Sequence, residues 1–229
     1  MSIFLRYAAY ALGTGLLIGF LVLREVQFPG ALQLQVYRDA SDVLGTSEYS
    51  IVEWLQLVLI SACGVIFGAV AWRRRGQRPL AVLFATVALA CLVRELDYFL
   101  DLHFRDNLWQ VMLALVLAIG GAYLVRHRRR AFVALARLWP SPAVALLFGG
   151  ALVLFPFSNL IGHEGFWQAL QGDDYRRIAK LAMEEMTELM GYAMCLCGAV
   201  EYWTEVGRPE GGDEGAGVMR RLAGLRRRD

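Results

Sequence analysis

Two clusters of charged side chains interrupt the long apolar stretches of this sequence. Their members are Arg94, Glu95 and Asp97 in one cluster, and Glu184, Glu185 and Glu188 in the other. An ionisable side chain inside a bilayer costs about 2.5–3.5 kcal/mol on insertion scales, so such residues persist mainly where they are paired or useful. These residues are therefore the first candidates for a functional site.

The spacing of the two clusters predicts that they meet. At about 1.5 Å of rise per residue, Arg94 and Glu188 reach similar depths in their helices. Since the period of a helix is about 3.6 residues, Glu184 and Glu188 share one face. We therefore expect Arg94 to be the charge partner of Glu188, with Asp97 as its second partner. The five carboxylates of the two clusters would bind a proton or a divalent cation.

Local roles compete with this hypothesis for some of the acids. Lys180 and Glu184 form an i,i+4 pair, and acids in a first helical turn are favoured by the helix dipole. Ser50 and Glu53 have the spacing of a capping box. On this alternative Glu53 caps a helix, and the glutamates near Lys180 belong to a solvated first turn. A role for Glu53 as a further site carboxylate stays open.

Two histidines raise the alternative of a metal site. His103 and His163 are expected on the same side of the membrane as the acids. Imidazole and carboxylate ligands suit zinc, manganese or iron, so His103, His163 and Glu53 are candidate metal ligands. No HxxH, HExxH or ExxH spacing occurs, however. The sequence identifies no cofactor, and a divalent metal stays one option.

The elements that carry these residues are those of a membrane protein. Of 229 residues 57% are hydrophobic and 19% are charged, and the mean hydropathy is +0.44. A soluble domain carries about 25% charged residues. A bilayer-spanning helix needs about 20 apolar residues. Six stretches meet that length, at about 3–23, 51–72, 79–100, 108–125, 141–161 and 179–203.

Arginines predict how these spans are oriented. The loops near 73–78 and 126–137 are rich in arginine and contain no acid, as is typical of cytoplasmic loops. The sequence thus predicts an all-α, polytopic bundle of six transmembrane helices over residues 1–203, with both termini cytoplasmic. Residues 204–229 would form a flexible, Gly-rich, basic cytoplasmic tail. The expected location is the inner (plasma) membrane of a bacterial-type cell, and the acids would face outward.

Three functional hypotheses follow. The leading one is an inner-membrane protein that uses an outward-facing carboxylate site to bind a proton or divalent cation, for transport or sensing. The first alternative is a metal-dependent hydrolase embedded in the membrane and acting on lipid or envelope precursors, and the second is a non-catalytic assembly or partner subunit. Whether the chain is an enzyme stays open. The expected partners are the bilayer, with anionic lipid at the cytoplasmic face, and in the last case a protein. No nucleic-acid module is present.

Overall fold

The computed structural model describes residues 3–30, 32, 36–38, 44–46, 50–175 and 177–207, and these are helical apart from turns and one small hairpin. The long helices are α1 (Ile3–Gln27), α2 (Ile51–Arg73), α3 (Arg78–Glu95), α5 (Leu108–Leu138) and α9 (Arg177–Gly207). A further long element consists of α6 (Pro142–Leu152), the π-helix η1 (Val153–Phe157) and α7 (Ser158–Ile161). These elements cover the six apolar stretches of the sequence.

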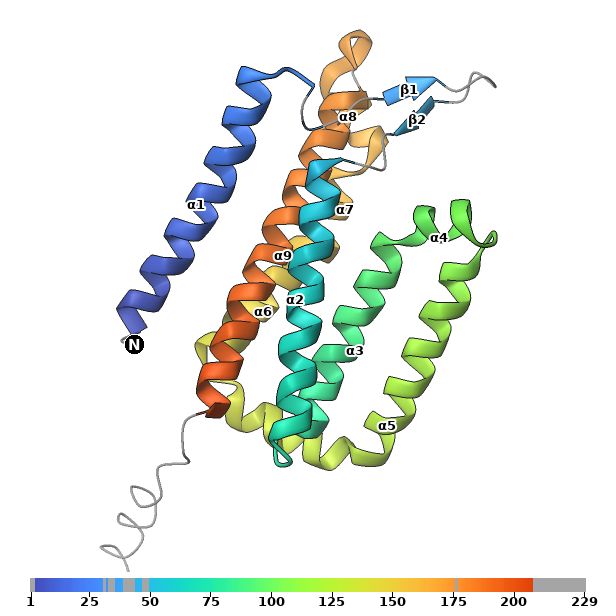
Figure 1. Ribbon diagram of the computed structural model, residues 1–229. Helices are drawn as coiled ribbons and strands as arrows, with labels where there is room; N and C mark the ends of the chain where they lie inside the picture. Colours follow the sequence, from blue (N-terminus) through green and yellow to red (C-terminus); the bar gives the residue numbers. More distant parts are fainter. Residues whose placement is uncertain are drawn as a thin grey trace, which may run out of the picture.

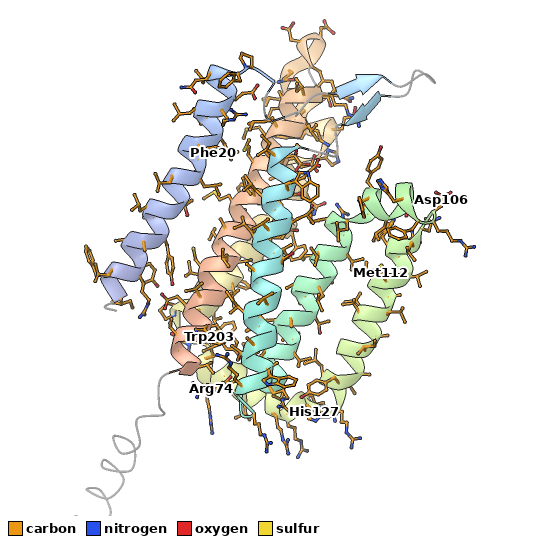
Figure 2. All side chains as sticks on the ribbon, in the orientation of Figure 1. Phe20, Arg74, Asp106, Met112, His127 and Trp203 are labelled. Atoms are coloured by element: carbon orange, nitrogen blue, oxygen red, sulfur yellow. The ribbon has the colours of Figure 1, made fainter. Side chains whose placement is uncertain are left out.

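The short elements lie at one end of the bundle, which we call the acidic end (Figure 1). They are the antiparallel strands β1 (Val36–Arg38) and β2 (Leu44–Thr46), the helices α4 (Asp97–His103) and α8 (Glu164–Gln171), and the 3-10 turn η2 (Gly172–Asp174). The opposite end, which we call the basic end, carries the start of α1, the turn between α2 and α3, and the end of α9 (Figure 1). Figure 2 shows Arg74 and Trp203 at the basic end and Asp106 at the acidic end.

Four of the long elements are long and apolar enough to cross a membrane, namely α1, α2, α5 and the unit from Pro142 to Ile161. Large apolar side chains on them face outward, with Phe4 77% exposed and Ile119 71% exposed. Contiguous apolar surface of this kind suits lipid better than water. The chain is therefore a helical membrane protein.

The expected span at 79–100 is not one continuous helix. α3 ends at Glu95, and α4 begins at Asp97 after a break at Leu96. Asp97 explains the break, because its Oδ1 accepts a hydrogen bond from the backbone N–H of Tyr98 at 2.6 Å. Aspartate side chains compete in this way with the regular helical hydrogen bonds.

The expected end of the last span also differs. α9 continues to Gly207, so residues 204–207, which were expected in the tail, are helical. The rest of that expected tail, 208–229, lies outside the described residues.

A proline changes the geometry of the span at 141–161. Pro156 lies inside the π-helix η1. Since proline has no N–H, it cannot make the usual bond to the carbonyl four residues earlier, and short π segments of this kind recur at functional sites. The wider turn is followed directly by Ser158, which begins α7 and points to α9.

Small residues let α6 and α9 approach closely. A Cβ atom on Gly150 would lie 2.9 Å from the carbonyl oxygen of Gly191, and one on Gly191 would lie 3.2 Å from that of Gly150. Gly191 therefore lies at the contact between α6 and α9. Membrane helices commonly pack through small residues in this way.

The ribbon of helix α1 stands apart from the rest of the bundle (Figure 1). Near the acidic end, Leu21 packs in a small cluster with Leu32, Val52 and Leu189. Near the basic end, Arg6 and Tyr10 contact Glu201. Next to the first contact, α1 and α9 line an apolar cavity of about 990 Å³. The contacts of α1 are therefore concentrated near its two ends.

Candidate functional site

A cavity of about 220 Å³ lies near the acidic end, between the start of α2, the junction of α3 with α4, and the first half of α9. Its lining residues are Glu53, Trp54, Leu57, Arg94, Glu95, Leu96, Asp97, Tyr98, Phe99, Glu184, Glu185 and Glu188. The structure thus brings together both charged clusters of the sequence, although they lie about ninety residues apart in the chain. We call this space the acidic cavity.

The deepest predicted acid, Glu188, is held by the element that follows the π-helix. Ser158 Oγ donates a hydrogen bond to Glu188 Oε1 at 2.6 Å. Ser158 itself is buried, with 2% of its surface exposed. Because η1 places Ser158 against α9, the proline in that segment contributes to the position of Glu188.

Glu95, at the end of α3, is bonded to the same helix α9. Tyr192 donates its hydroxyl to Glu95 Oε1 at 2.6 Å. Tyr192 is a buried residue on α9, one turn beyond Glu188. This hydrogen bond holds the last residue of α3 against α9.

Glu185 is bonded from α2. The side-chain amide of Gln56 donates both to Glu185 Oε2 and to the backbone carbonyl of Glu185, each at 3.0 Å. Gln56 is fully buried, and among the described residues its own Oε1 has no hydrogen-bond partner. Glu185, like Glu95 and Glu188, is therefore bonded across helices by an uncharged donor.

The other three acids of the cavity are bonded within their own part of the chain. Lys180 Nζ lies 2.8 Å from Glu184 Oε2, which confirms the i,i+4 pair. Glu53 forms the expected capping box with Ser50 at the start of α2, which is also confirmed. Asp97 accepts the N–H of its neighbour Tyr98, as described above. These three acids therefore have local structural roles as well as lining the cavity.

Arg94 does not form the expected ion pair. Arg94 and Glu188 both line the acidic cavity, yet within the described residues no acid lies within salt-bridge distance of Arg94. Glu188 is instead turned toward Ser158, and Arg94 is exposed at the rim. The predicted depths placed Arg94 and Glu188 in one cavity, but depth alone does not determine which neighbour a side chain contacts.

The balance of charge in the cavity is strongly negative. Six carboxyl groups line it, and Arg94 on the rim and Lys180 beside Glu184 are the bases nearest to them in the described structure. If every acid is ionised, these eight groups carry a formal charge of −4. Like charges in a partly enclosed space repel, and protons or cations relieve that repulsion.

Neither candidate histidine lines the acidic cavity. The ring of His103 stacks on Phe99 at 4.4 Å, and its Nδ1 lies 3.1 Å from the carbonyl oxygen of Phe99. His163 is the N-cap of α8, where its Nδ1 accepts the N–H of Phe166 at 3.3 Å. In the described part of the chain, no three His, Cys, Asp or Glu side chains are grouped so as to hold a metal ion.

Sequence reasoning missed the three donors that hold the acids across helices. Ser158, Gln56 and Tyr192 each lie inside or beside an apolar stretch. Polar side chains at such positions are a weak signal, because in a membrane they commonly bond to another helix. Gln56 gave the clearest signal of the three, because it is a polar residue one turn after the candidate acid Glu53 on α2.

One comparison with known proteins gave a result for this chain. Residues 7–201 match the model of a family described as a domain of unknown function (DUF8692). The chain belongs to this family. The match to DUF8692 includes every residue of the acidic cavity and the donors from α2, α7 and α9. No curated protein and no solved structure matched the chain.

Proposed function

We propose that this chain crosses the membrane six times, with the basic end in the cytoplasm and the acidic end outside. Two features support the proposal. First, α3 and α9 run alongside the four apolar elements (Figure 1). Second, arginines are concentrated at the basic end, where α1 begins and α9 ends. Excess Arg and Lys marks cytoplasmic loops. Both chain termini would then be cytoplasmic.

We further propose that the acidic cavity binds protons reversibly from the outer side. The observation that carries this proposal is the arrangement of Glu95, Glu185 and Glu188. Each is bonded across helices by one uncharged donor, and the cavity holds more acids than bases. A carboxyl group that takes up a proton keeps its hydrogen bond and relieves the repulsion from its neighbours.

A proton fits the described geometry better than a divalent cation does. A divalent metal needs several carboxylate oxygens that converge on one point, and the described residues contain no such group. The hydrolase alternative depended on His103 or His163, and both make contacts elsewhere. The experiment below therefore tests binding of a divalent cation as the alternative to binding of a proton.

Sensing is better supported than transport. Between the acidic cavity and the basic end, the space among α2, α3 and α9 is filled by Phe67, Phe84 and Tyr202, whose ring centroids lie 5.2–6.0 Å apart. These rings belong to a buried core that is almost entirely apolar. A cavity closed on one side suits reversible binding, and the bonds that link α2, α3 and α7 to α9 would transmit a change in protonation to helix packing.

Infrared difference spectroscopy on the purified full chain tests this function. Lowering the pH should produce the carbonyl signal of protonated carboxyl groups, and Glu188→Gln should remove part of it. The matched control is Glu164→Gln, which changes an exposed acid on α8 bonded to Gln168 and not to the cavity. Equal signals in the wild-type protein and in both variants would rule out proton binding at Glu188.

A thermal-unfolding series gives the cation arm of the same experiment. If the cavity binds protons, unfolding temperatures at fixed pH should be insensitive to added Mg²⁺ or Mn²⁺. A rise in the unfolding temperature with Mn²⁺ that Glu188→Gln abolishes would replace the proton by a divalent cation. Glu164→Gln should behave like the wild-type protein in either case.

A further inference from the structure

A second polar cavity lies at the basic end, far from the acidic cavity in the bundle. Its volume is about 1000 Å³. It is lined by Arg73, Arg74, Arg75, Gly76, Gln77, Arg129, Arg130, Val133, Ala134, Arg137, Leu138, Glu205 and Val206. Six of these residues are arginines, and we call the space the arginine pocket. Nothing in the proposed proton site requires it.

Two segments far apart in the sequence form this pocket. The end of α2 and the turn that follows provide three consecutive arginines, and the second half of α5 provides three more. The end of α9 closes the pocket through Glu205 and Val206. Ordinary sorting of positive charge to the cytoplasm explains why each segment is basic, but it does not require them to converge around a hollow.

Most of these guanidinium groups have no protein partner in the described structure. Arg74 Nη2 lies 3.4 Å from the carbonyl oxygen of Gly207, and the Arg73 guanidinium lies over the Trp203 ring at 5.4 Å. The described residues provide no hydrogen bond or ion pair for the remaining four, which are Arg75, Arg129, Arg130 and Arg137. Against six arginines the pocket lining has one acid, Glu205, so its formal charge is +5.

The surroundings of the pocket place it at a membrane surface. Phe132 is 73% exposed and Trp139 is 63% exposed, on or just after the part of α5 that carries the arginines. A helix with arginines on one side and large apolar residues on another is typical of a segment lying in the headgroup region. Tryptophan prefers the same region, and Trp203 beside Arg73 agrees with this placement.

We propose that the arginine pocket binds a ligand carrying two phosphate groups, and that this ligand is the headgroup of an anionic phospholipid. Guanidinium groups bind phosphate oxygens through paired, charge-assisted hydrogen bonds. Two phosphates offer enough acceptors for arginines from both segments at once. The exposed Phe132 and Trp139 would contact the acyl chains of a lipid, whereas a free diphosphate would leave them without a partner.

Native mass spectrometry of the full chain tests the pocket with cardiolipin, which carries two phosphates, against phosphatidylcholine. The test variant is R75Q/R130Q, which removes one unpartnered arginine from each segment. The control is R126Q/R128Q, which removes the same charge from α5 at exposed positions that do not line the pocket. We expect R75Q/R130Q to weaken cardiolipin binding at least about tenfold and the control to change it by less than about twofold.

The remaining outcomes distinguish a phospholipid from a soluble diphosphate, and specific binding in the pocket from general attraction by positive charge. Displacement of cardiolipin by pyrophosphate, or pyrophosphate binding in lipid-free detergent, would assign the pocket to a soluble diphosphate instead. Equal losses in the two double variants would overturn the pocket and leave general attraction between basic surface and anionic lipid. If R75Q/R130Q fails to fold, R75K/R130K keeps the charge but removes the guanidinium fork, and unchanged affinity in that variant would also overturn the proposal.

Discussion

Arg6 on α1 and Glu201 on α9 form a buried ion pair, with Arg6 Nε 2.8 Å from Glu201 Oε1 and side-chain exposures of 7% and 0%. The two residues lie 195 positions apart in the sequence. Tyr10, one turn further along α1, donates its hydroxyl to the same Glu201 oxygen at 2.9 Å. This contact joins the first described helix to the last one near the basic end, where α1 makes few other contacts with the bundle.

Breaking this ion pair by removing one partner should destabilise the folded protein. Arg6→Gln or Glu201→Gln leaves one charged group without its partner, and each should therefore lower the free energy of unfolding. The double variant should lose less than the sum of the two, because neither charge remains. Denaturation of the purified protein in detergent measures all three values. Additive losses in the double variant would show that the two residues are not coupled. The control is Arg24→Gln, which removes the arginine that stacks on Phe28 at the other end of α1.

The hydrogen bond between Tyr192 and Glu95 gives a prediction for the acidic cavity. Tyr192→Phe removes only the hydroxyl, so Glu95 loses its bond to α9 while the packing of the ring is kept. An intramolecular hydrogen bond contributes about 0.5–3 kcal/mol, with the upper part of that range for an ionised acceptor, and the free energy of unfolding should fall within that range. Tyr123→Phe is a fitting control, because Tyr123 lies on α5, and its ring stacks on His127 away from the cavity. Equal effects of the two changes on stability would contradict the assignment.

Local patterns in the sequence predicted local parts of the site. The capping box of Ser50 and Glu53 and the pair of Lys180 with Glu184 both depend on residues three or four positions apart, and both are present in the structure. The charged residues of α3 and α9 also share a cavity as expected. Counting the rise per residue was enough to place them at one level, because a membrane helix fixes depth along its axis.

Contacts between distant helices were not predictable in the same way. The donor to Glu188 is 30 positions away, and the donors to Glu95 and Glu185 are 97 and 129 positions away. Which of them a carboxylate faces depends on the rotation of each helix about its axis. The break at Leu96 and the π-helix at Pro156 alter that rotation locally. For this reason Arg94 and Glu188 lie in one cavity without forming the expected pair.

The close approach of α6 and α9 predicts that Gly150 tolerates no side chain. In Gly150→Ala the new Cβ atom would meet the backbone at Gly191 and Cys195, with distances of 2.9 and 3.1 Å, so the two helices would have to move apart. We expect the free energy of unfolding to fall by about 1–3 kcal/mol. Gly68 lies inside α2 with no atom within 4 Å of an added Cβ. Gly68→Ala should therefore be neutral or stabilising by about 0.5–1 kcal/mol. A similar loss in both variants would mean that helix packing does not limit Gly150.

The proposed orientation predicts which loops are accessible from outside the cell. Asp106 lies in the turn between α4 and α5 at the acidic end, and Gly76 lies in the turn between α2 and α3 at the basic end. In a variant whose native cysteines are replaced, Asp106→Cys should react with a membrane-impermeant maleimide in intact cells. Gly76→Cys should react only after the cells are made permeable. Because Gly76→Cys leaves the neighbouring arginines unchanged, it does not disturb the charge that sets the orientation. The reverse labelling pattern would place the acidic cavity in the cytoplasm, and labelling of both sites in intact cells would mean that the segments between them do not cross the membrane an odd number of times.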